Sequence, residues 1–200
     1  MTPESAQSVS WWMAPRINEI VWLDHYLLSA EEAWREPLVA AMHRAQPFGS
    51  VCEVGCHCGP NLKRFRQAYG AFPYTGLDVN GRALAYGRRM ALRDGYGDEA
   101  RWFLGSVLDP VAMSWPDREF ETVVSSSMLS LLSPEDVGLA LIAMARIANT
   151  RVMIQEPTDA SHDGYFHQWV HDYPAMLAQV VPAFTVAEMA AGVLVAERHS

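Results

Sequence analysis

The stretch Val51-Cys-Glu-Val-Gly-Cys-His-Cys-Gly-Pro-Asn-Leu62 decides the fold of this chain. Its first four residues are mainly apolar and predict a short strand that is buried on both faces. Gly55 and Gly59 permit a tight turn after this strand, and Pro60 suits the first position of a helix. The unpaired N–H groups at the start of such a helix attract a carboxylate or a phosphate. The stretch therefore predicts a strand, a turn and a helix that together hold a small anionic group.

The spacing of the glycines separates two folds that use this construction. A dinucleotide-binding loop needs the pattern G-x-G-x-x-G, in which glycine lets the backbone approach a pyrophosphate. At the corresponding positions after Gly55, this chain has His57 and Pro60. The pattern therefore disfavours NAD binding, and an NAD-dependent oxidoreductase is kept only as a less favoured alternative.

The segment instead resembles the first motif of class I S-adenosylmethionine-dependent methyltransferases, an acidic residue followed by G-x-G-x-G. The motif is present as Glu53-Val-Gly55-Cys-His57-Cys-Gly59, with His57 in place of the middle glycine. Histidine is one of the non-glycine residues most often tolerated at positive φ. The resemblance implies that S-adenosylmethionine binds against this turn and the start of the helix, with these cofactor-binding residues: Glu53, Gly55, Cys56, His57, Gly59 and Asn61.

A carboxylate ends the next strand, Tyr74-Thr-Gly-Leu-Asp78. Asp78 comes 78 − 55 = 23 residues after Gly55, about the distance at which such folds place an acid on the ribose hydroxyls. The alternative is that Asp78 and Asn80 only cap the helix that follows. The resemblance implies that Asp78 binds the ribose of the cofactor and that Val79 lies beside it.

Two further strands complete the predicted cofactor site. The third strand runs over residues 100–107, and the resemblance implies that the residues after its glycine lie along the adenine. Ser106 replaces the acid usual at this place, and it can hydrogen-bond an amine without charge assistance. The fourth strand runs over residues 120–129 into a serine-rich turn. Four residues of these segments are assigned to the cofactor site: Ser106, Val107, Ser125 and Ser126.

Strands and helices alternate through the rest of the chain. This alternation predicts an α/β fold with a doubly wound, mostly parallel sheet that has helices on both faces. The resemblance covers about residues 45–198 and implies the Rossmann-like methyltransferase sheet of seven strands with an antiparallel last strand. The remaining elements are expected at 82–93 and 133–149 for helices, at 151–157 for the fifth strand, and at 184–188 and 192–197 for a closing hairpin.

The composition and the charge narrow the class of protein. A chain of 200 residues with 50% hydrophobic residues is long and apolar enough for one unit with a large core. We expect residues 47–200 to form the cofactor-binding domain and residues 1–46 a helical segment in front of it. A net charge of −8 disfavours nucleic acid as the acceptor, because Lys and Arg contacts to phosphates supply most of that affinity. The lack of a long apolar run and of a signal-peptide pattern predicts a cytoplasmic protein without a membrane partner.

The chain has three cysteines, all within residues 52–58. Their close spacing excludes a disulfide framework. The order Cys-x3-Cys-His-Cys suggests a metal site with His57 as a fourth ligand. A turn wrapped around a metal ion could not also hold a cofactor. No metal is therefore predicted, and Cys56 and Cys58 are interpreted as small residues in a crowded turn.

The N-terminal segment 10–26 is rich in aromatic residues. The spacing of its apolar residues predicts one amphipathic helix, and Ser29-Ala-Glu-Glu32 has the form of a capping box that opens a second helix. Two interpretations stay open. These helices cover one edge of the sheet, or they form a lid over the acceptor site with Trp11, Trp12 and Trp22 as flat apolar walls. The apolar positions concerned are Ile17, Ile20, Val21 and Leu23.

Residues 157–173 follow the fifth strand, and ligands bind beyond the carboxyl ends of the strands in such sheets. His167 and His171 are four residues apart, so a helix would place both on one side. A metal site at this pair is the less favoured interpretation. A histidine or a tyrosine here could instead remove a proton from the acceptor, so the predicted catalytic residues are Tyr165, His167 and His171.

The predicted activity is methyl transfer from S-adenosylmethionine to a small-molecule acceptor, at oxygen or nitrogen. Because the sulfonium cofactor is already activated, the protein mainly needs to align the acceptor and to remove a proton. One alternative is a non-catalytic protein that keeps the fold as a cofactor-binding or interaction module. The sequence indicates neither the identity of the acceptor nor the oligomeric state.

Overall fold

Seven strands of the described residues form one sheet, in the order β3-β2-β1-β4-β5-β7-β6. The computed structural model describes residues 1–46, 49–111, 113–156, 169–190 and 192–199. The strands are β1 Val51–Val54, β2 Tyr74–Asp78, β3 Ala100–Leu104, β4 Phe120–Ser126, β5 Ala148–Gln155, β6 Phe184–Ala190 and β7 Val193–Arg198.

The pairing of the strands confirms the predicted sheet. β1 pairs in parallel with β2 on one side and with β4 on the other, and β3 and β5 extend the parallel part outward. β7 is antiparallel to both of its neighbours, β5 and β6. Strand ends differ from the expectation by a few residues: β3 stops at Leu104, and β5 already begins at Ala148. The carboxyl ends of β1, β2 and β4 lie side by side, where a ligand site is expected.

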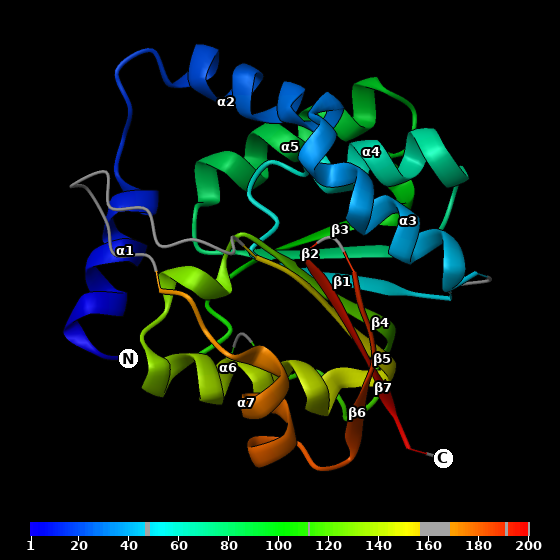
Figure 1. Ribbon diagram of the computed structural model, residues 1–200. Helices are drawn as coiled ribbons and strands as arrows, with labels where there is room; N and C mark the ends of the chain where they lie inside the picture. The colour runs from blue at the N-terminus through cyan, green and yellow to red at the C-terminus, as the bar shows by residue number, and fades with distance from the viewer. Residues whose placement is uncertain (47–48, 112, 157–168, 191, 200) are drawn as a thin grey trace.

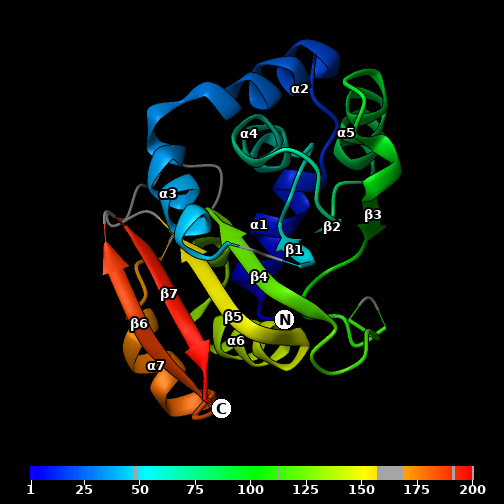
Figure 2. The same ribbon diagram turned by 90° about the vertical axis from the view of Figure 1, so that its right-hand side faces the viewer.

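Helices cover both faces of the sheet, as predicted. In Figure 1, α2, α3, α4 and α5 lie over one face and α6 and α7 over the other. Figure 2 shows the same two layers from the side. The α-helices are α1 Pro3–Met13, α2 Glu19–Leu28, α3 Glu36–Arg44, α4 Pro60–Tyr69, α5 Gly81–Arg93, α6 Pro134–Ile147 and α7 Tyr173–Val180. The 3-10 turns are η1 Ser29–Glu31, η2 Ala33–Arg35, η3 Gly97–Glu99 and η4 Leu129–Leu131.

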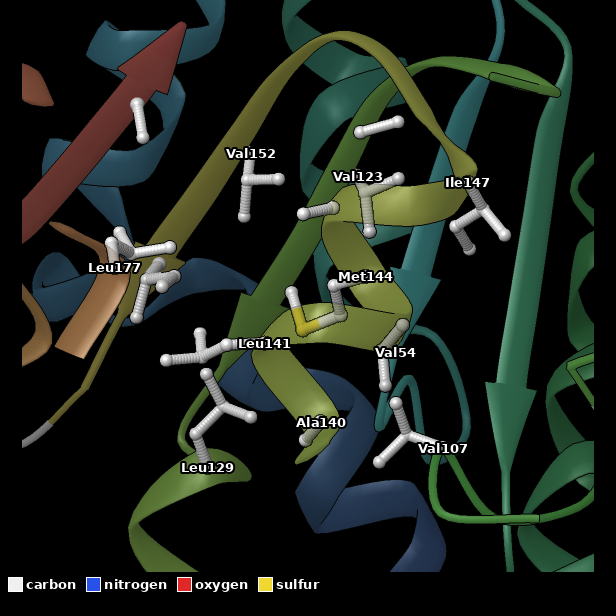
Figure 3. Close-up of a cluster of buried hydrophobic side chains, with 14 of the residues drawn as sticks. Val54, Val107, Val123, Leu129, Ala140, Leu141, Met144, Ile147, Val152 and Leu177 are labelled. Atoms are coloured by element: carbon white, nitrogen blue, oxygen red, sulfur yellow. The ribbon is translucent and has the colours of Figure 1, made fainter. Parts of the chain in front are cut away.

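Each face of the sheet has its own apolar core because successive strand residues point to opposite faces. In β4, Val123 belongs to the cluster under α6 and α7, whereas Val124 belongs to the cluster under α3 and α4. Figure 3 shows Val123 and Val152 of the first cluster beside Met144 of α6. Both valines and the methionine are fully buried. The nearly continuous apolar strands thus form the centre of a three-layer fold.

The amphipathic helix expected within the segment 10–26 is present only in part, as α2 over Glu19–Leu28. The first helix ends at Met13 and α2 begins only at Glu19. Ala14, which precedes a proline, has extended backbone, and Asn18 has a φ of 55°, so neither continues a helix. Of the expected apolar positions, Leu23 is buried, whereas Ile17 is 95% exposed. Ile20 and Val21 are exposed too.

The predicted capping box at Ser29 is wrong. Ser29 ends α2 instead, and its hydroxyl donates to the carbonyl of Tyr26 while it accepts from Arg35. Glu32, at the fourth position of the box, has an extended backbone with ψ of 136°. Because the hydroxyl is committed to α2 and Arg35, it cannot cap a helix that follows. The next helix opens at Glu36 with a proline in its first turn.

Candidate functional site

The turn after β1 has the backbone that its glycines predict. Gly55 and Gly59 have φ of 81° and 80°, and His57 has φ of 48°. The N–H groups of Gly55 and Cys56 donate to the carbonyl of Leu77 at 2.8 and 3.1 Å, which ties the turn to the end of β2. The two glycines adopt positive φ without steric cost, whereas the side chain of His57 makes this backbone unfavourable.

The carboxylate of Asp78 joins the turn to the start of α5. Its Oδ2 accepts from the N–H of His57 at 2.7 Å, and its Oδ1 accepts from the N–H of Asn80 at 2.8 Å. The side chain of Asn80, not that of Asp78, caps α5 by accepting from Arg82 and Ala83, each at 3.1 Å. Burial raises the pKa of Asp78 to about 6, although these N–H donors lower it. The two backbone bonds leave further lone pairs of this carboxylate for hydroxyl donors.

A cleft opens along the carboxyl ends of β1, β2 and β4. The cleft and its open mouth together contain about 670 Å³ of space free of protein atoms, open solvent included. Its wall comes from α1, α2, the turn after β1, the end of β2 and the segments after β3 and β4. The lining residues are Val9, Trp12, Tyr26, Val54, Gly55, His57, Leu77, Asp78, Val79, Gly105, Ser106, Val107, Ser126, Ser127, Met128, Leu131 and Leu132.

The structure brings most of the predicted cofactor residues together at this cleft. The ones that line it are Gly55, His57, Asp78, Val79, Ser106, Val107 and Ser126. The ones that lie behind the wall are Glu53, Cys56, Gly59, Asn61 and Ser125. The hydroxyl of Ser106 accepts from the N–H of Leu108 at 3.2 Å, and that of Ser126 donates to Gln155 at 3.0 Å. The predicted cofactor residues therefore divide into a group that lines the cleft and a group that is buried behind its wall.

Glu53 belongs to a buried network behind the turn. Its Oε1 accepts from Asn61 at 2.7 Å, and its Oε2 accepts from the hydroxyl of Tyr74 at 2.5 Å. Arg35 in turn donates to the side-chain oxygen of Asn61. Burial raises the pKa of Glu53 to about 7. The network joins β1 to β2, α4 and η2, and none of its four residues lines the cleft.

Helix α1 crosses the carboxyl end of the sheet, where Figure 1 shows it between the two helix layers. At one end of α1, the N–H of Thr2 donates to Asp136 at 2.6 Å, and Ser5 accepts from the N–H of Ser133 at 2.8 Å. At its other end, the carbonyl of Trp12 accepts from the side chain of Asn80 at 2.7 Å. The helix is thus bonded to the starts of both α6 and α5, so it bridges the two sides of the cleft.

The imidazole of His57 lies among aromatic rings of the N-terminal helices. Its centroid is 5.6 Å from Trp12, 4.9 Å from Trp22 and 4.1 Å from Tyr26. His57 is only 3% exposed, and neither ring nitrogen has a hydrogen-bond partner in the part of the chain that the structure describes. Burial, with a smaller contribution from Arg16, lowers the pKa of His57 to about 3. The ring is therefore neutral at ordinary pH.

Glu156 is a site residue that the sequence analysis missed. Its carboxylate accepts from three successive N–H groups, those of Met128, Leu129 and Ser130, at 3.0, 2.9 and 3.1 Å. These bonds fix the segment after β4, where Met128 lies against Gly55: a Cβ added at Gly55 would be 2.5 Å from Met128 Cγ. The sequence signal for Glu156 was an acid directly after the fifth strand, because that position lies at the same edge of the sheet as Asp78.

The predicted catalytic residues are only partly within the described chain. Tyr165 and His167 lie outside the described residues. His171 is half-buried and does not line the cleft, because its Nε2 donates to the carbonyl of Leu132 at 3.0 Å. Leu132 itself does line the cleft. His171 therefore contacts a residue of the cleft wall without lining the cleft itself.

The three cysteines are buried thiols that belong to separate apolar clusters. Within the described ranges, no group of three or more His, Cys, Asp or Glu side chains is arranged to hold a metal ion. Burial raises the pKa of Cys58 to about 12, which keeps its thiol protonated. None of the helices in the described part of the chain has the length and apolarity needed to cross a membrane.

Comparisons with known proteins agree with this geometry. Residues 51–150, half of the chain, match the model of the family described as "Methyltransferase domain". No curated protein matches the chain in sequence.

Solved structures share the fold at low sequence identity. Burkholderia thailandensis 1,6-didemethyltoxoflavin-N1-methyltransferase, solved with S-adenosylhomocysteine, has a TM-score of 0.64 and 16% identity over 94% of this chain and 93% of that chain. Magnesium protoporphyrin IX methyltransferase from Synechocystis PCC 6803, solved with SAM, has a TM-score of 0.65 and 14% identity over 99% and 92%. A geranyl diphosphate methyltransferase solved with sinefungin has a TM-score of 0.73 and 13% identity over 99% and 100%.

The family match covers the glycine turn, Asp78 and the strands that surround them. It therefore confirms the resemblance drawn from the motif, and with it an enzyme rather than a non-catalytic module. The chain belongs to the methyltransferase-domain family, as a class I methyltransferase that uses S-adenosylmethionine.

Proposed function

We propose that this protein transfers a methyl group from S-adenosylmethionine to the oxygen or nitrogen of a small-molecule acceptor. The observation that carries the proposal is the meeting of Asp78 with the glycine turn at the wall of the cleft. The carboxylate lies at the tip of β2 and bonds the N–H of His57 at 2.7 Å. Such an acid beside such a turn is the arrangement that holds a nucleoside in a doubly wound fold.

The residues of the cleft fit this cofactor. Asp78 offers free lone pairs to ribose hydroxyls, and the apolar side chains of Leu77, Val79 and Val107 offer a surface for a flat base. Gly55 lets a ligand approach the backbone, and the flexible side chain of Met128 over it can move aside. When bound, the cofactor supplies a methyl group on a positively charged sulfur, which is already activated for transfer.

The protein's own part is to align the acceptor and to keep water out. We propose that residues 1–46 act as the lid, because α1 bridges the cleft and places Val9 and Trp12 in its wall. The acceptor lies between this lid and the segment 157–173. A proton released by the acceptor passes to a base in that segment, for which Tyr165 and His167 are the candidates. His171 supports the wall through the carbonyl of Leu132.

Calorimetric titration with S-adenosylmethionine, S-adenosylhomocysteine and NADH tests the cofactor assignment. We expect both sulfur compounds to bind with one site per chain and NADH not to bind. Binding of NADH alone would contradict the proposal and restore the oxidoreductase alternative. Methyl transfer itself is then detected by mass spectrometry of an acceptor library, as a gain of one methyl group that depends on the cofactor.

Variants of the segment 157–173 test the base. His167→Ala and Tyr165→Phe are expected to keep the affinity for S-adenosylhomocysteine, and loss of the true base lowers turnover by about a hundred-fold. His171→Ala is expected to have a smaller effect, because its ring bonds a wall carbonyl. Turnover at the parent level in all three variants would show that proximity alone carries the reaction.

A further inference from the structure

His57 carries two costs that a glycine at its position would avoid. Its backbone has φ of 48°, a region that disfavours residues with a side chain. Its imidazole is almost completely buried, yet both nitrogens lack a hydrogen-bond partner among the described residues. A buried polar group without a hydrogen-bond partner destabilises a folded protein. An unfavourable backbone conformation and an unpaired buried ring at one residue of a ligand cleft point to a functional role for the side chain of His57.

The backbone and the side chain of His57 face different parts of the site. Its N–H bonds Asp78, so the backbone belongs to the cofactor side. Its ring contacts Trp12 and Tyr26, which line the cleft from the lid helices. The side chain therefore belongs to the lid side, which the cofactor does not need. A half-turn about the Cβ–Cγ bond exchanges each ring nitrogen with a carbon, so the ring can present a nitrogen without backbone movement.

A positive charge lies behind this group of rings. The guanidinium of Arg16 is 3.6 Å from the centroid of Trp11 and 5.2 Å from that of Trp22. Trp22 in turn contacts His57. The Nε of Arg16 is buried and has no hydrogen-bond partner in the described part of the chain. The charge also lowers the pKa of His57, which shows a positive potential at the ring.

We infer that His57, Trp12 and Tyr26 form the acceptor wall of the cleft and select a planar aromatic acceptor that is neutral or anionic. The flat apolar rings favour stacking with another ring. A nitrogen of the neutral imidazole gives the acceptor's hydroxyl or amine a single hydrogen-bond partner. Arg16 disfavours a cationic acceptor. His57 is thus a specificity-determining residue, and this inference rests on the proposed methyl transfer.

Three probes with the same ring system and different charge test this wall. The protein is first saturated with S-adenosylhomocysteine, and 1-naphthol, 1-naphthoate and 1-naphthylmethylammonium are then titrated by calorimetry. We expect naphthol and naphthoate to bind and the ammonium compound to bind at least ten-fold more weakly. Failure of S-adenosylhomocysteine to bind contradicts the proposed function itself. Normal binding of it together with no binding of naphthol, or with preferred binding of the ammonium compound, overturns only the acceptor wall.

Single substitutions distinguish the residues that bind the acceptor from those that bind the cofactor. His57→Gly is expected to keep or to raise the affinity for S-adenosylhomocysteine, because glycine suits the positive φ, and to weaken naphthol binding at least ten-fold. Trp12→Leu is expected to weaken naphthol binding similarly. Phe103→Leu is the matched control, since Phe103 is 38% exposed on β3 and does not line the cleft. Naphthol binding that is unchanged in His57→Gly, with cofactor affinity intact, overturns the inference whether or not Trp12→Leu folds.

Discussion

The two sides of the cleft are held in place by different kinds of contact. On the cofactor side, the turn after β1 and Asp78 are joined by hydrogen bonds between groups near each other in one βαβ unit. On the lid side, α1 is bonded to the start of α5 by the contact of Trp12 with Asn80, which are 68 residues apart. The first side depends on local backbone geometry. The second depends on tertiary contacts that no short pattern encodes.

This difference predicts how each side tolerates substitution. The turn needs a residue without a side chain at Gly55, where the φ is positive, and a carboxylate at Asp78. His57 belongs to both sides, because its N–H bonds Asp78 and its ring contacts Trp12 and Tyr26. A substitution at His57 therefore tests the two sides of the cleft separately.

The largest expected effect is on the cofactor side. Asp78→Ala removes charge-assisted hydrogen bonds to the ribose that are worth about 1.5–3 kcal/mol, so the affinity for S-adenosylmethionine falls about ten- to hundred-fold. Calorimetry measures the change. Asp94→Ala, which removes an exposed carboxylate at the end of α5, is the control and should bind normally. An unchanged affinity in Asp78→Ala would mean that this carboxylate only organises the turn.

The pH dependence of the free energy of unfolding tests whether the imidazole of His57 is buried and neutral between the two sides of the cleft. Its pKa is about 3 in the folded protein and about 6.5 when exposed, so the unfolded chain binds a proton that the folded one does not. Stability attributable to His57 therefore falls as the pH drops below about 6.5, by about 1.4 kcal/mol per pH unit. Between pH 6 and 4 the loss is about 2.5 kcal/mol by the same relation.

Three buried carboxyl groups act in the opposite direction, so the comparison must be made against a variant. Burial raises the pKa of Glu53 to about 7 and that of Asp78 to about 6, and it also raises the pKa of Glu156, so each group destabilises the fold as the pH rises. All three groups are present in the parent and in His57→Gly, so the difference between their urea-denaturation curves isolates His57. His25→Gln, which removes an exposed histidine from α2, is the matched control. Parallel pH profiles for the parent and His57→Gly would contradict a buried neutral imidazole.

A helix glycine tests how tightly the cofactor turn is packed. A Cβ at Gly87 of α5 would lie 2.6 Å from the backbone oxygen of Cys58, so Gly87→Ala forces α5 and the turn apart. We expect a loss of about 2 kcal/mol in the free energy of unfolding, and weaker cofactor binding. Gly138→Ala in α6 is the control, because a Cβ there meets no atom within 4 Å. That variant should be neutral or slightly stabilised by its helix propensity.

The sequence predicted the sheet and the backbone of the turn after β1 because both follow from local rules. Apolar runs gave the strands, and positive φ at Gly55 and Gly59 follows from the lack of a side chain. For the N-terminal helices, the sequence left two interpretations open, a cover for one edge of the sheet or a lid over the acceptor site. Ser29 has the spacing of a capping box, yet Arg35 and Tyr26 compete for its hydroxyl, and that competition exists only in the folded chain. The aromatic surroundings of His57 are likewise tertiary and leave no local signature.

The smallest expected effect loosens the lid side alone. Ser5, fully buried in α1, accepts from the N–H of Ser133, the residue that caps α6. Ser5→Ala leaves that N–H without a partner and should cost about 1 kcal/mol of stability. Ser10→Ala, on the exposed side of the same helix, is the control for the change in helix propensity.

Hydrogen exchange and calorimetry together locate the effect of Ser5→Ala. If α1 is a lid held by separate bonds at its two ends, its amides exchange faster while those of β1 and β2 keep their protection. The affinity for S-adenosylhomocysteine stays near that of the parent, because Asp78 and the turn keep their bonds. Naphthol binding weakens, since the wall carried by Trp12 is less well ordered. Equal losses in cofactor and naphthol binding would instead show that the two sides of the cleft fold as one unit, and the comparison between them would no longer hold.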